Sequence, residues 1–224
     1  MNLTFIVLGV ILVIVLYILY KSLLAPTSVV SSQTHLQSKP KPIDLKTLTT
    51  SPGINCAYAL WIYANNLSAN GDLIFKIPVS NNDQTNSNIS LIIQNNTKLM
   101  VKVKKNDNSY HEYEVTPNFP LQRWEYVVIS LNQNILDLYL DGKLIKSINL
   151  NQTSSVPAKN SQIVFGEGDI YIAGFKILSD PMDPQTAWNN YLNGSGTTTR
   201  SLTNYGLSMT FSKNNNPEKT ITLF

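Results

Sequence analysis

The feature that most constrains the fold is the stretch Trp124–Leu150, whose pattern predicts three consecutive antiparallel strands. The strands are expected at Trp124–Asn132, Ile135–Leu140 and Lys143–Asn149, because these runs are rich in β-branched, aromatic and leucine residues and are separated by short turns. Asp141-Gly142 predicts a two-residue type I′ turn, which needs positive φ at both central positions. The expected cross-strand pairs are Leu140 with Lys143, Tyr139 with Leu144, Leu138 with Ile145 and Asp137 with Lys146.

Further short strands flank this stretch, with polar turns every 8 to 12 residues or so. Asparagine-rich turns are expected at Ser80–Ser87 and Lys105–Ser109. Strands this short, with no long helical period between them, predict an all-β, two-sheet antiparallel sandwich. The other predicted strands are Cys56–Ala64, Asp72–Val79, Ile89–Ile93, Leu99–Lys104, Tyr110–Val115, Gln162–Phe165 and Ile170–Leu178.

One short helix is predicted after the last of these strands. Asp183 can cap its first turn, Pro184 suits the first helical position, and Gly194 can close it in the left-handed conformation. An apolar stripe at helical spacing indicates a face that packs on the core. Its members are Ala187, Trp188, Tyr191 and Leu192.

Two pieces of this pattern resemble a known family. The first is a tryptophan, an apolar strand, a short turn and a strand ending in LYLDGKLI; the second is Gly166 with the strand and helix of Asp169–Gly194. Together they resemble laminin-G-like and concanavalin A-like jelly-roll domains over about residues 51–194. The residues that carry the resemblance are Trp124, Asp141, Gly142, Gly166 and Trp188. That fold hosts lectins, glycosidases, adhesion modules and virion proteins, so the resemblance implies a jelly roll without fixing a function.

The amino-terminal residues predict a membrane anchor. Met1–Tyr20 has no charged side chain, and about 20 apolar residues span the roughly 30 Å hydrocarbon core of a bilayer. A cleaved signal peptide and a buried core helix are the alternatives. A signal peptide would need a basic start and a small-residue cleavage site, which this sequence lacks. A core helix would be shorter and less uniformly apolar. The anchor residues are Phe5, Leu8, Leu12 and Leu16, with Tyr17, Tyr20 and Lys21 at the lipid headgroups.

The predicted organisation is an anchor at residues 1–24, a flexible linker at 25–51, a jelly roll at 52–196 and an added β-hairpin at 197–224. The linker carries three prolines among Ser, Thr, Gln and Lys. The orientation stays open: lysines that follow the anchor favour a cytosolic domain, whereas five N-x-S/T matches within the globular domain favour a lumenal one. Those matches begin at Asn66, Asn88, Asn95, Asn151 and Asn193.

The charge distribution argues against nucleic-acid binding. Residues 51–224 hold thirteen basic and thirteen acidic residues, so the globular part is neutral. A groove for nucleic acid needs clustered Lys and Arg. The small cluster Lys98, Lys102, Lys104 and Lys105 is predicted to be the solvated face of a strand. Cys56 is the only cysteine and is expected to be a small core residue.

No catalytic set emerges from the sequence. Jelly-roll glucanases mount acids as E-x-D-x-x-E, and the nearest match, Glu167 with Asp169, has Ile172 at the last position, so both acids are interpreted as turn residues. His35 and His111 stand apart from other candidate catalytic groups. We therefore expect no enzyme activity and no cofactor. Calcium is not expected either, since the loop at Asn81, Asn82 and Asp83 offers one carboxylate.

Three functions remain. The first is a membrane-anchored structural protein similar to minor capsid or membrane proteins of large icosahedral double-stranded DNA viruses, placed between an internal membrane and the capsid shell. Its expected partners are a lipid bilayer and other structural proteins, such as capsid proteins. The second is a cell-surface module that binds glycans or mediates adhesion, and the third is a glycosidase. The candidate interaction residues are Asn81, Asn82 and Asp83 with Tyr205, Phe211 and Phe224 of the carboxyl-terminal hairpin.

Overall fold

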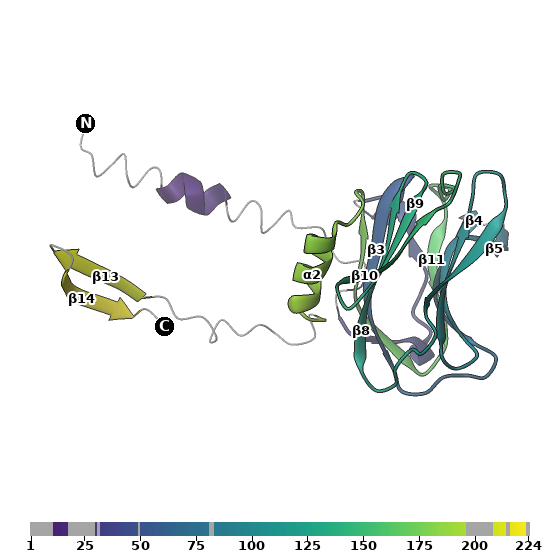
Figure 1. Ribbon diagram of the computed structural model, residues 1–224, viewed down its shortest axis with the longest axis horizontal. Coiled ribbons are helices and arrows are strands. Elements are labelled where there is room, and N and C mark those ends of the chain that lie inside the picture. Colours follow the sequence, from purple (N-terminus) through teal and green to yellow (C-terminus); the bar gives the residue numbers. More distant parts are fainter. Residues whose placement is uncertain are drawn as a thin grey trace.

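The chain folds into a sandwich of two six-stranded antiparallel sheets with one helix on its outside (Figure 1). The computed structural model describes residues 11–17, 30, 32–48, 50–80, 83–195, 208–213 and 216–222. Sheet 1 has the order β1-β12-β3-β8-β9-β10, and sheet 2 has the order β2-β11-β4-β5-β6-β7. The strands of sheet 1 are β1 (Thr34–His35), β3 (Asn55–Ala64), β8 (Trp124–Asn132), β9 (Ile135–Leu140), β10 (Lys143–Asn149) and β12 (Ile170–Leu178). Those of sheet 2 are β2 (Ile43–Asp44), β4 (Asp72–Ser80), β5 (Asp83–Gln94), β6 (Lys98–Lys104), β7 (Tyr110–Thr116) and β11 (Gln162–Phe165).

The main core lies between the sheets and is filled by alternate residues of the central strands. In β3 these are Cys56, Tyr58, Leu60 and Ile62, each at most 2% exposed. They meet side chains of sheet 2 such as Phe75, so the two-residue period of the sequence corresponds to one buried face per sheet. The predicted all-β two-sheet sandwich is therefore confirmed.

The central stretch behaves as its sequence predicts, apart from one bulge. Strands β8, β9 and β10 have the predicted bounds, and the turn between β9 and β10 has positive φ at Asp141 (49°) and Gly142 (75°). The pairs Leu140–Lys143 and Tyr139–Leu144 are confirmed, but Lys146 faces Leu138 and Ser147 faces Asp137. The predicted partners of Ile145 and Lys146 are wrong, because a bulge after Leu144 adds one unpaired residue to β10.

The turn expected at Ser80–Ser87 is also shorter than predicted. Strand β5 already begins at Asp83, which pairs with Ser80. Asp83 therefore belongs to a strand end, and most of the asparagine-rich run lies in the β4–β5 hairpin. Polar residues are tolerated in these strand ends because the ladder hydrogen bonds use the backbone.

Helix α2 (Pro184–Leu192) packs on the outer face of sheet 1. Thr186 N donates to Asp183 Oδ1 at 2.9 Å, which confirms the predicted cap, and Gly194 has φ +75°. Only part of the predicted apolar stripe is covered: Ala187 is buried, whereas Trp188 is 37% and Leu192 60% exposed. The helix approaches the β9–β10 turn so closely that a Cβ on Gly142 would lie 2.9 Å from Trp188 Cα.

Residues 30 and 32–48, which we call the strap, fall within the predicted flexible linker but pack on the sandwich. Strand β1 pairs with β12 and strand β2 pairs with β11, so one stretch closes the same side of both sheets. Leu36 and Leu45 are 0% and 2% exposed. A flexible linker is therefore wrong for this stretch, because two isolated leucines and two edge strands hold it in place.

The predicted anchor falls largely outside the described residues. Residues 11–17 form a helix in which Leu12, Leu16 and Tyr17 are exposed, whereas Phe5, Leu8, Tyr20 and Lys21 are not described. No helix within the described ranges has the length and apolar character needed to cross a bilayer. The added hairpin is present as β13 (Ser208–Lys213) and β14 (Asn216–Thr222). Phe211 lies in β13, while Tyr205 and Phe224 lie outside the described residues.

Candidate functional site

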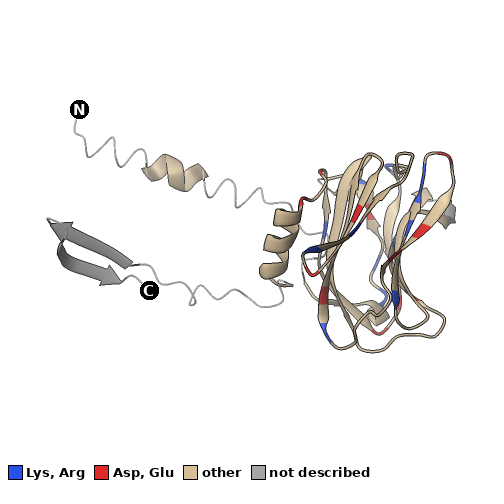
Figure 2. Ribbon diagram, viewed as in Figure 1, with Lys and Arg blue, Asp and Glu red and all other residues tan. Residues whose placement is uncertain are grey.

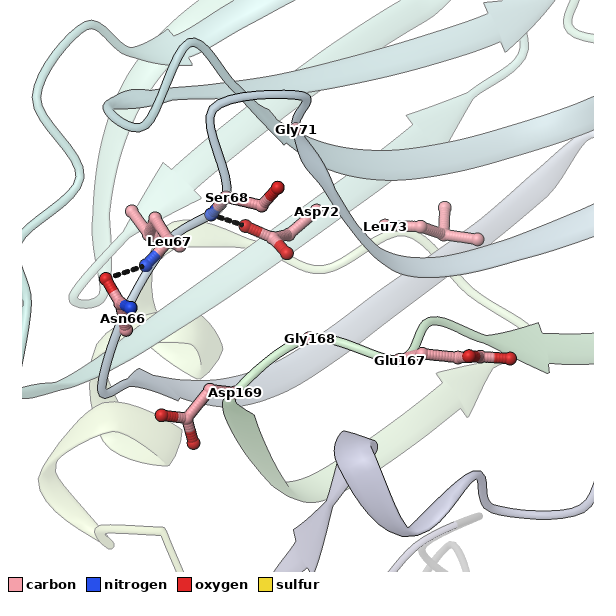
Figure 3. A pocket seen from close by; sticks show the side chains of 9 residues that line it. All are labelled: Asn66, Leu67, Ser68, Gly71, Asp72, Leu73, Glu167, Gly168 and Asp169. Atoms are coloured by element: carbon pink, nitrogen blue, oxygen red, sulfur yellow. Dashed lines mark hydrogen bonds between the residues drawn. The ribbon is translucent and has the colours of Figure 1, made fainter.

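A hollow of about 420 Å³ opens at one end of the sandwich, between two loops that are far apart in the sequence (Figure 3). The β3–β4 loop forms one wall and the β11–β12 loop forms the other. We call this hollow the rim pocket. Its lining residues are Asn66, Leu67, Ser68, Gly71, Asp72, Leu73, Glu167, Gly168 and Asp169.

Two glycines allow the walls to meet. A Cβ on Gly166 would lie 1.7 Å from the Leu73 carbonyl oxygen, and one on Gly168 would lie 2.8 Å from Asp72 Oδ1. A side chain at position 166 would require the backbone to move, and one at position 168 would require the Asp72 carboxylate to shift. The GEGD run is thus a connection between strands, as predicted for Glu167 and Asp169, and its glycines set the shape of the pocket.

The β3–β4 wall is held by its own polar groups. Ser68 N donates to Asp72 Oδ2 at 2.6 Å, and Leu67 N donates to Asn66 Oδ1 at 2.9 Å, as Figure 3 shows. Asp72 is 8% exposed, so its carboxylate is fixed at the base of the loop rather than free in solvent. Backbone donors on one side leave carboxylate oxygens available for donors from a ligand.

Asp169 is oriented by residues from two other segments. Its Oδ1 accepts a hydrogen bond from Asn65 Nδ2 at 3.1 Å and one from His35 Nε2 at 2.9 Å. These hydrogen bonds, first from Asn65 and then from His35, lower the pKa of Asp169, which keeps the carboxylate ionised. The strap therefore fixes a residue of the rim pocket, although the sequence placed His35 in a linker.

A row of aromatic side chains crosses the outer face of sheet 1 beside the pocket. His35, Tyr171, Tyr63 and Trp124 are consecutive cross-strand partners in β1, β12, β3 and β8. The rings of His35 and Tyr171 stack with centroids 4.2 Å apart, and those of Tyr63 and Trp124 are 5.4 Å apart. Neighbouring strands lie about 4.8 Å apart, so a row that crosses four strands is about 14 Å long. We call these four residues the aromatic row; its first member, His35, is hydrogen-bonded to Asp169 of the rim pocket.

The rim pocket is acidic, and the cations near it are already engaged. Lys39 Nζ lies 2.8 Å from Glu167 Oε2, and both side chains are exposed. Figure 2 shows acidic and basic residues interspersed over the rest of the sandwich. The predicted lysine cluster agrees with this: Lys98 pairs with Glu114 and Lys102 with Glu112 on the outer face of sheet 2. The prediction is wrong for the fourth member of the cluster, Lys105, which is buried.

A second group of acids lies under the β9–β10 turn. Arg123 bonds both Glu125 and Asp141, and Tyr126 N donates to Asp141 Oδ1 at 2.9 Å. Burial, followed by the nearby Asp141 charge, raises the pKa of Glu125 to about 7. The Glu125 side chain is 1% exposed, so a substrate cannot reach it, and this acid pair does not form an open glycosidase cleft.

The remaining predicted sites give a mixed outcome. Asn81 and Asn82 lie outside the described residues, so an interaction role for their loop stays a prediction. In the described part of the chain, no cluster of three or more His, Cys, Asp or Glu residues is arranged to hold a metal ion. Cys56 is buried and burial raises its pKa to about 11, which confirms a core role.

The N-x-S/T matches differ in accessibility. Asn88 is 3% exposed, donates to Pro78 O and accepts from Ser155 Oγ, so the fold occupies its amide. Asn66, Asn95, Asn151 and Asn193 are exposed. Asn66 is the one of these four that lines the rim pocket.

Several pocket residues were missed by sequence reasoning. Asn65, Ser68 and Asp72 belong to no motif in the sequence, and His35 falls within the predicted linker. Two weak signals existed: the alternating glycines of the GEGD run, which indicate close backbone approach, and the polar Asn65–Ser68 loop directly after a buried strand.

Comparison with solved structures places the same fold in botulinum neurotoxins. The serotype D ligand-binding domain in complex with N-acetylneuraminic acid has a TM-score of 0.52 and 17% identity, covering 65% of this chain and 38% of that one. The receptor-binding domain of serotype D gives 0.52 and 18%, covering 66% and 39%. That of the C/D mosaic serotype gives 0.51 and 17%, covering 62% and 36%. The chain thus spans less than two fifths of these toxin domains, and at such identity the likeness concerns the fold alone.

A comparison with curated proteins gives no match. The laminin-G-like family model of the concanavalin A-like lectin/glucanases superfamily matches residues 41–176, which is more than half of the chain. This range begins within the strap and ends in β12, so it contains both walls of the rim pocket. The chain belongs to the concanavalin A-like lectin/glucanase superfamily.

Proposed function

We propose that this chain is a non-enzymatic binding module that recognises a glycan at the rim pocket. The observation that carries the proposal is a preformed polar hollow in which Asp72 and Asp169 are fixed by hydrogen bonds, with the aromatic row beside it. Its volume of about 420 Å³ is within the usual range for small-ligand sites. A sugar ring carries many hydroxyl donors and one apolar face, which suits carboxylate acceptors next to aromatic side chains.

The charge of the pocket narrows the class of glycan. Asp72, Glu167 and Asp169 line it, and Lys39 and His35 are bonded to two of these acids. Neutral sugars and amino sugars fit such a lining, whereas the carboxylate of a sialic acid would be repelled. The sialic acid bound by the serotype D toxin domain supports sugar binding by proteins with this fold and does not define the sugar for this chain.

The proposal is tested with immobilised neutral, amino and sialylated oligosaccharides. Neutral or amino sugars should bind, and Asp72→Asn and Asp169→Asn should each weaken binding about tenfold or more, since each removes a charge-assisted hydrogen bond. Glu112→Gln, on edge strand β7 and outside the pocket lining, is the matched control and should bind like the unmodified chain. Binding that none of these variants alters, or release of hydrolysed sugar, would contradict the proposal.

A second candidate is the structural role in a virion, with residues 1–24 as a single-pass anchor. The observation that favours it is the packed strap: Val30, the first residue in the described part of the chain that pairs with the sandwich, follows the predicted anchor after residues 25–29. Five residues reach about 20 Å at most. Such a short tether suits a protein that holds a fixed position between an internal membrane and a capsid shell.

This role is tested by membrane flotation and by analysis of purified virions. The expected result is a chain that floats with lipid vesicles, resists extraction by high salt and cross-links to a capsid protein. Recovery as a soluble monomer without detergent would refute the anchor, and absence from virions would leave the cell-surface alternative.

A further inference from the structure

The rim pocket carries more negative than positive charge. Three acids line it, namely Asp72, Glu167 and Asp169. Lys39 is bonded to Glu167 on the exposed surface, and His35 is hydrogen-bonded to Asp169. In the part of the chain that the structure describes, Asp72 makes no ion pair with a Lys, Arg or His side chain. The lining therefore favours a ligand that brings a positive charge.

Asp72 is the least exposed of the three acids, at 8%, and only one of its oxygens is used by the chain. Its Oδ2 accepts a hydrogen bond from Ser68 N at 2.6 Å. Its Oδ1 faces the opposite wall, since a Cβ on Gly168 would lie 2.8 Å from it, and Figure 3 shows the carboxylate between the two walls. No described residue donates a hydrogen bond to Oδ1. A buried carboxylate is normally paired with a cation or with several donors, so this oxygen marks the place of a donor that the chain does not supply.

Asp169 adds a second ionised carboxylate to the same pocket. Its Oδ1 accepts hydrogen bonds from Asn65 Nδ2 and His35 Nε2, and these bonds lower the pKa of the carboxyl group. Both donors bind the same oxygen, so Oδ2 has no hydrogen-bond donor among the described residues. The Asp169 side chain is 42% exposed, so a ligand can reach it. The two aspartates thus leave one oxygen each for a ligand.

The chemical group that best matches these carboxylate oxygens is an ammonium. A protonated amine brings three donors, no acceptor and one positive charge. A hydroxyl brings one donor without a charge, and an N-acetylated amine brings one amide donor and a carbonyl oxygen that a carboxylate repels. A hydrogen bond between two charged groups is about twice as strong as a neutral one. Among sugars, those with an unacetylated amine are therefore the best match to the pocket.

We propose that the rim pocket selects amino sugars by their protonated amine, with Asp72 Oδ1 as the acceptor that holds it. This inference rests on the proposed glycan-binding function and narrows it to one class of sugar. Asp169 contributes a second negative charge at the same pocket. Acetylation of the amine removes its charge and two of its three donors, so the pocket discriminates against the acetylated sugar.

The test compares two oligosaccharides of equal length on the full chain, one made of glucosamine and the other of N-acetylglucosamine. Isothermal titration calorimetry, at a pH where the amine is protonated, should give a Kd that is lower for the glucosamine oligomer by about tenfold or more. Added salt should weaken binding of the glucosamine oligomer and leave binding of the acetylated one nearly unchanged, because only the first involves an ion pair. The salt dependence is a readout that needs no variant.

Asp72→Asn separates the charge of the pocket from its shape. The asparagine keeps an oxygen that can accept a hydrogen bond from Ser68 N but carries no charge, so the two affinities should come within about twofold of each other. Asp169→Asn, at the more exposed position, should lower the preference for the glucosamine oligomer as well. Asp107→Asn, in the exposed β6–β7 turn, is the matched control and should keep the full preference.

The outcomes separate this inference from glycan binding as such. Equal affinity of the unmodified chain for the two oligomers, or tighter binding of the acetylated one, would overturn the selection of amino sugars and leave glycan binding in place. Absence of binding across the whole panel of sugars would contradict glycan binding itself. Spermidine carries amines without a sugar ring and should bind more weakly than the glucosamine oligomer. Equal binding of spermidine would overturn the assignment of the ligand to a sugar.

Discussion

The two lateral edges of the sandwich differ in how far they are covered by other parts of the chain. On one side, the strap adds β1 to sheet 1 and β2 to sheet 2, and it buries Leu36 and Leu45 almost completely. On the other side, sheet 1 ends at β10, whose Leu144 and Ile145 are each 46% exposed. A closed edge is part of the core, whereas an open edge is a surface available for contact.

The closed edge contributes to the stability of the domain, whereas the open edge offers a surface for contacts. The closed edge also reaches the rim pocket, because His35 of the strap bonds Asp169. The open edge lies under α2 and beside the β9–β10 turn, where the buried Glu125 meets Asp141. Substitutions at the two edges should therefore have different consequences.

The largest expected effect is the loss of a strap leucine. Leu36→Ala should lower the free energy of unfolding by about 2–5 kcal/mol, since it leaves a cavity at a fully buried position. Leu144→Ala is the matched substitution at the open edge and should change stability by about 0.5 kcal/mol or less. Urea unfolding followed by tryptophan fluorescence measures both. Similar losses for the two variants would mean that the edges do not differ in the way described.

The next effect is a pH dependence on the open-edge side. The pKa of Glu125 is about 7 in the folded chain against an ordinary value of 4.5, so the folded protein keeps a proton that the unfolded chain loses. Stability should therefore fall as pH rises from about 4.5 to 7, by up to about 3 kcal/mol.

Glu125→Gln should remove this loss, because an amide does not ionise. Unfolding measured at pH 5 and pH 8 should then show a smaller difference for the variant than for the unmodified chain. Asp107→Asn, at an exposed turn, is the control and should keep the full difference. An unchanged pH dependence in Glu125→Gln would show that other groups cause it.

A smaller effect is expected where α2 meets the β9–β10 turn. Gly142→Ala should cost about 1–3 kcal/mol, since it combines a positive φ with a Cβ 2.9 Å from Trp188 Cα. Gly194→Ala has the same φ of +75° and no atom within 4 Å, so it should cost about 1 kcal/mol. Thermal unfolding of the two variants measures the two losses of stability. Equal losses would show that α2 moves away from residue 142 without a measurable loss of stability.

The smallest effect concerns the hydrogen bond between His35 of the strap and Asp169 of the rim pocket. His35→Phe keeps an aromatic ring against Tyr171 but removes the hydrogen bond to Asp169. We expect faster amide hydrogen exchange in residues 32–38, with little change in global unfolding. His111→Phe, on β7, is the control. Unchanged exchange in the strap would assign its order to Leu36 and the β1–β12 pairing alone.

The sequence predicted the strands whose signals are local. The bounds of β8, β9, β10, β11 and β12 and the cap at Asp183 follow from apolar alternation, the Asp141-Gly142 turn and capping chemistry. The strap was missed because its two-residue strands carry almost no propensity of their own and exist through tertiary burial of Leu36 and Leu45. The bulge at Ile145 was missed because register there depends on packing against neighbouring strands.

The rim pocket was harder to predict than the fold. Its walls are loops, and Asn65 and Asp169, which bond each other, are 104 residues apart in the chain. Only the β3–β12 pairing of Ala64 with Ile170 brings them together. The sequence alone does not show that these two residues are neighbours. The glycines of the GEGD run indicate only that another part of the backbone passes close to this loop.

The most direct test of glycan recognition is a nuclear magnetic resonance titration of the labelled chain with the neutral or amino oligosaccharide that binds best in the panel. The account predicts that the amides of Asn65–Asp72 and Glu167–Tyr171 shift in a saturable manner and that Asp72→Asn abolishes those shifts. Shifts confined to the outer face of sheet 2, or none at any accessible sugar concentration, would contradict it.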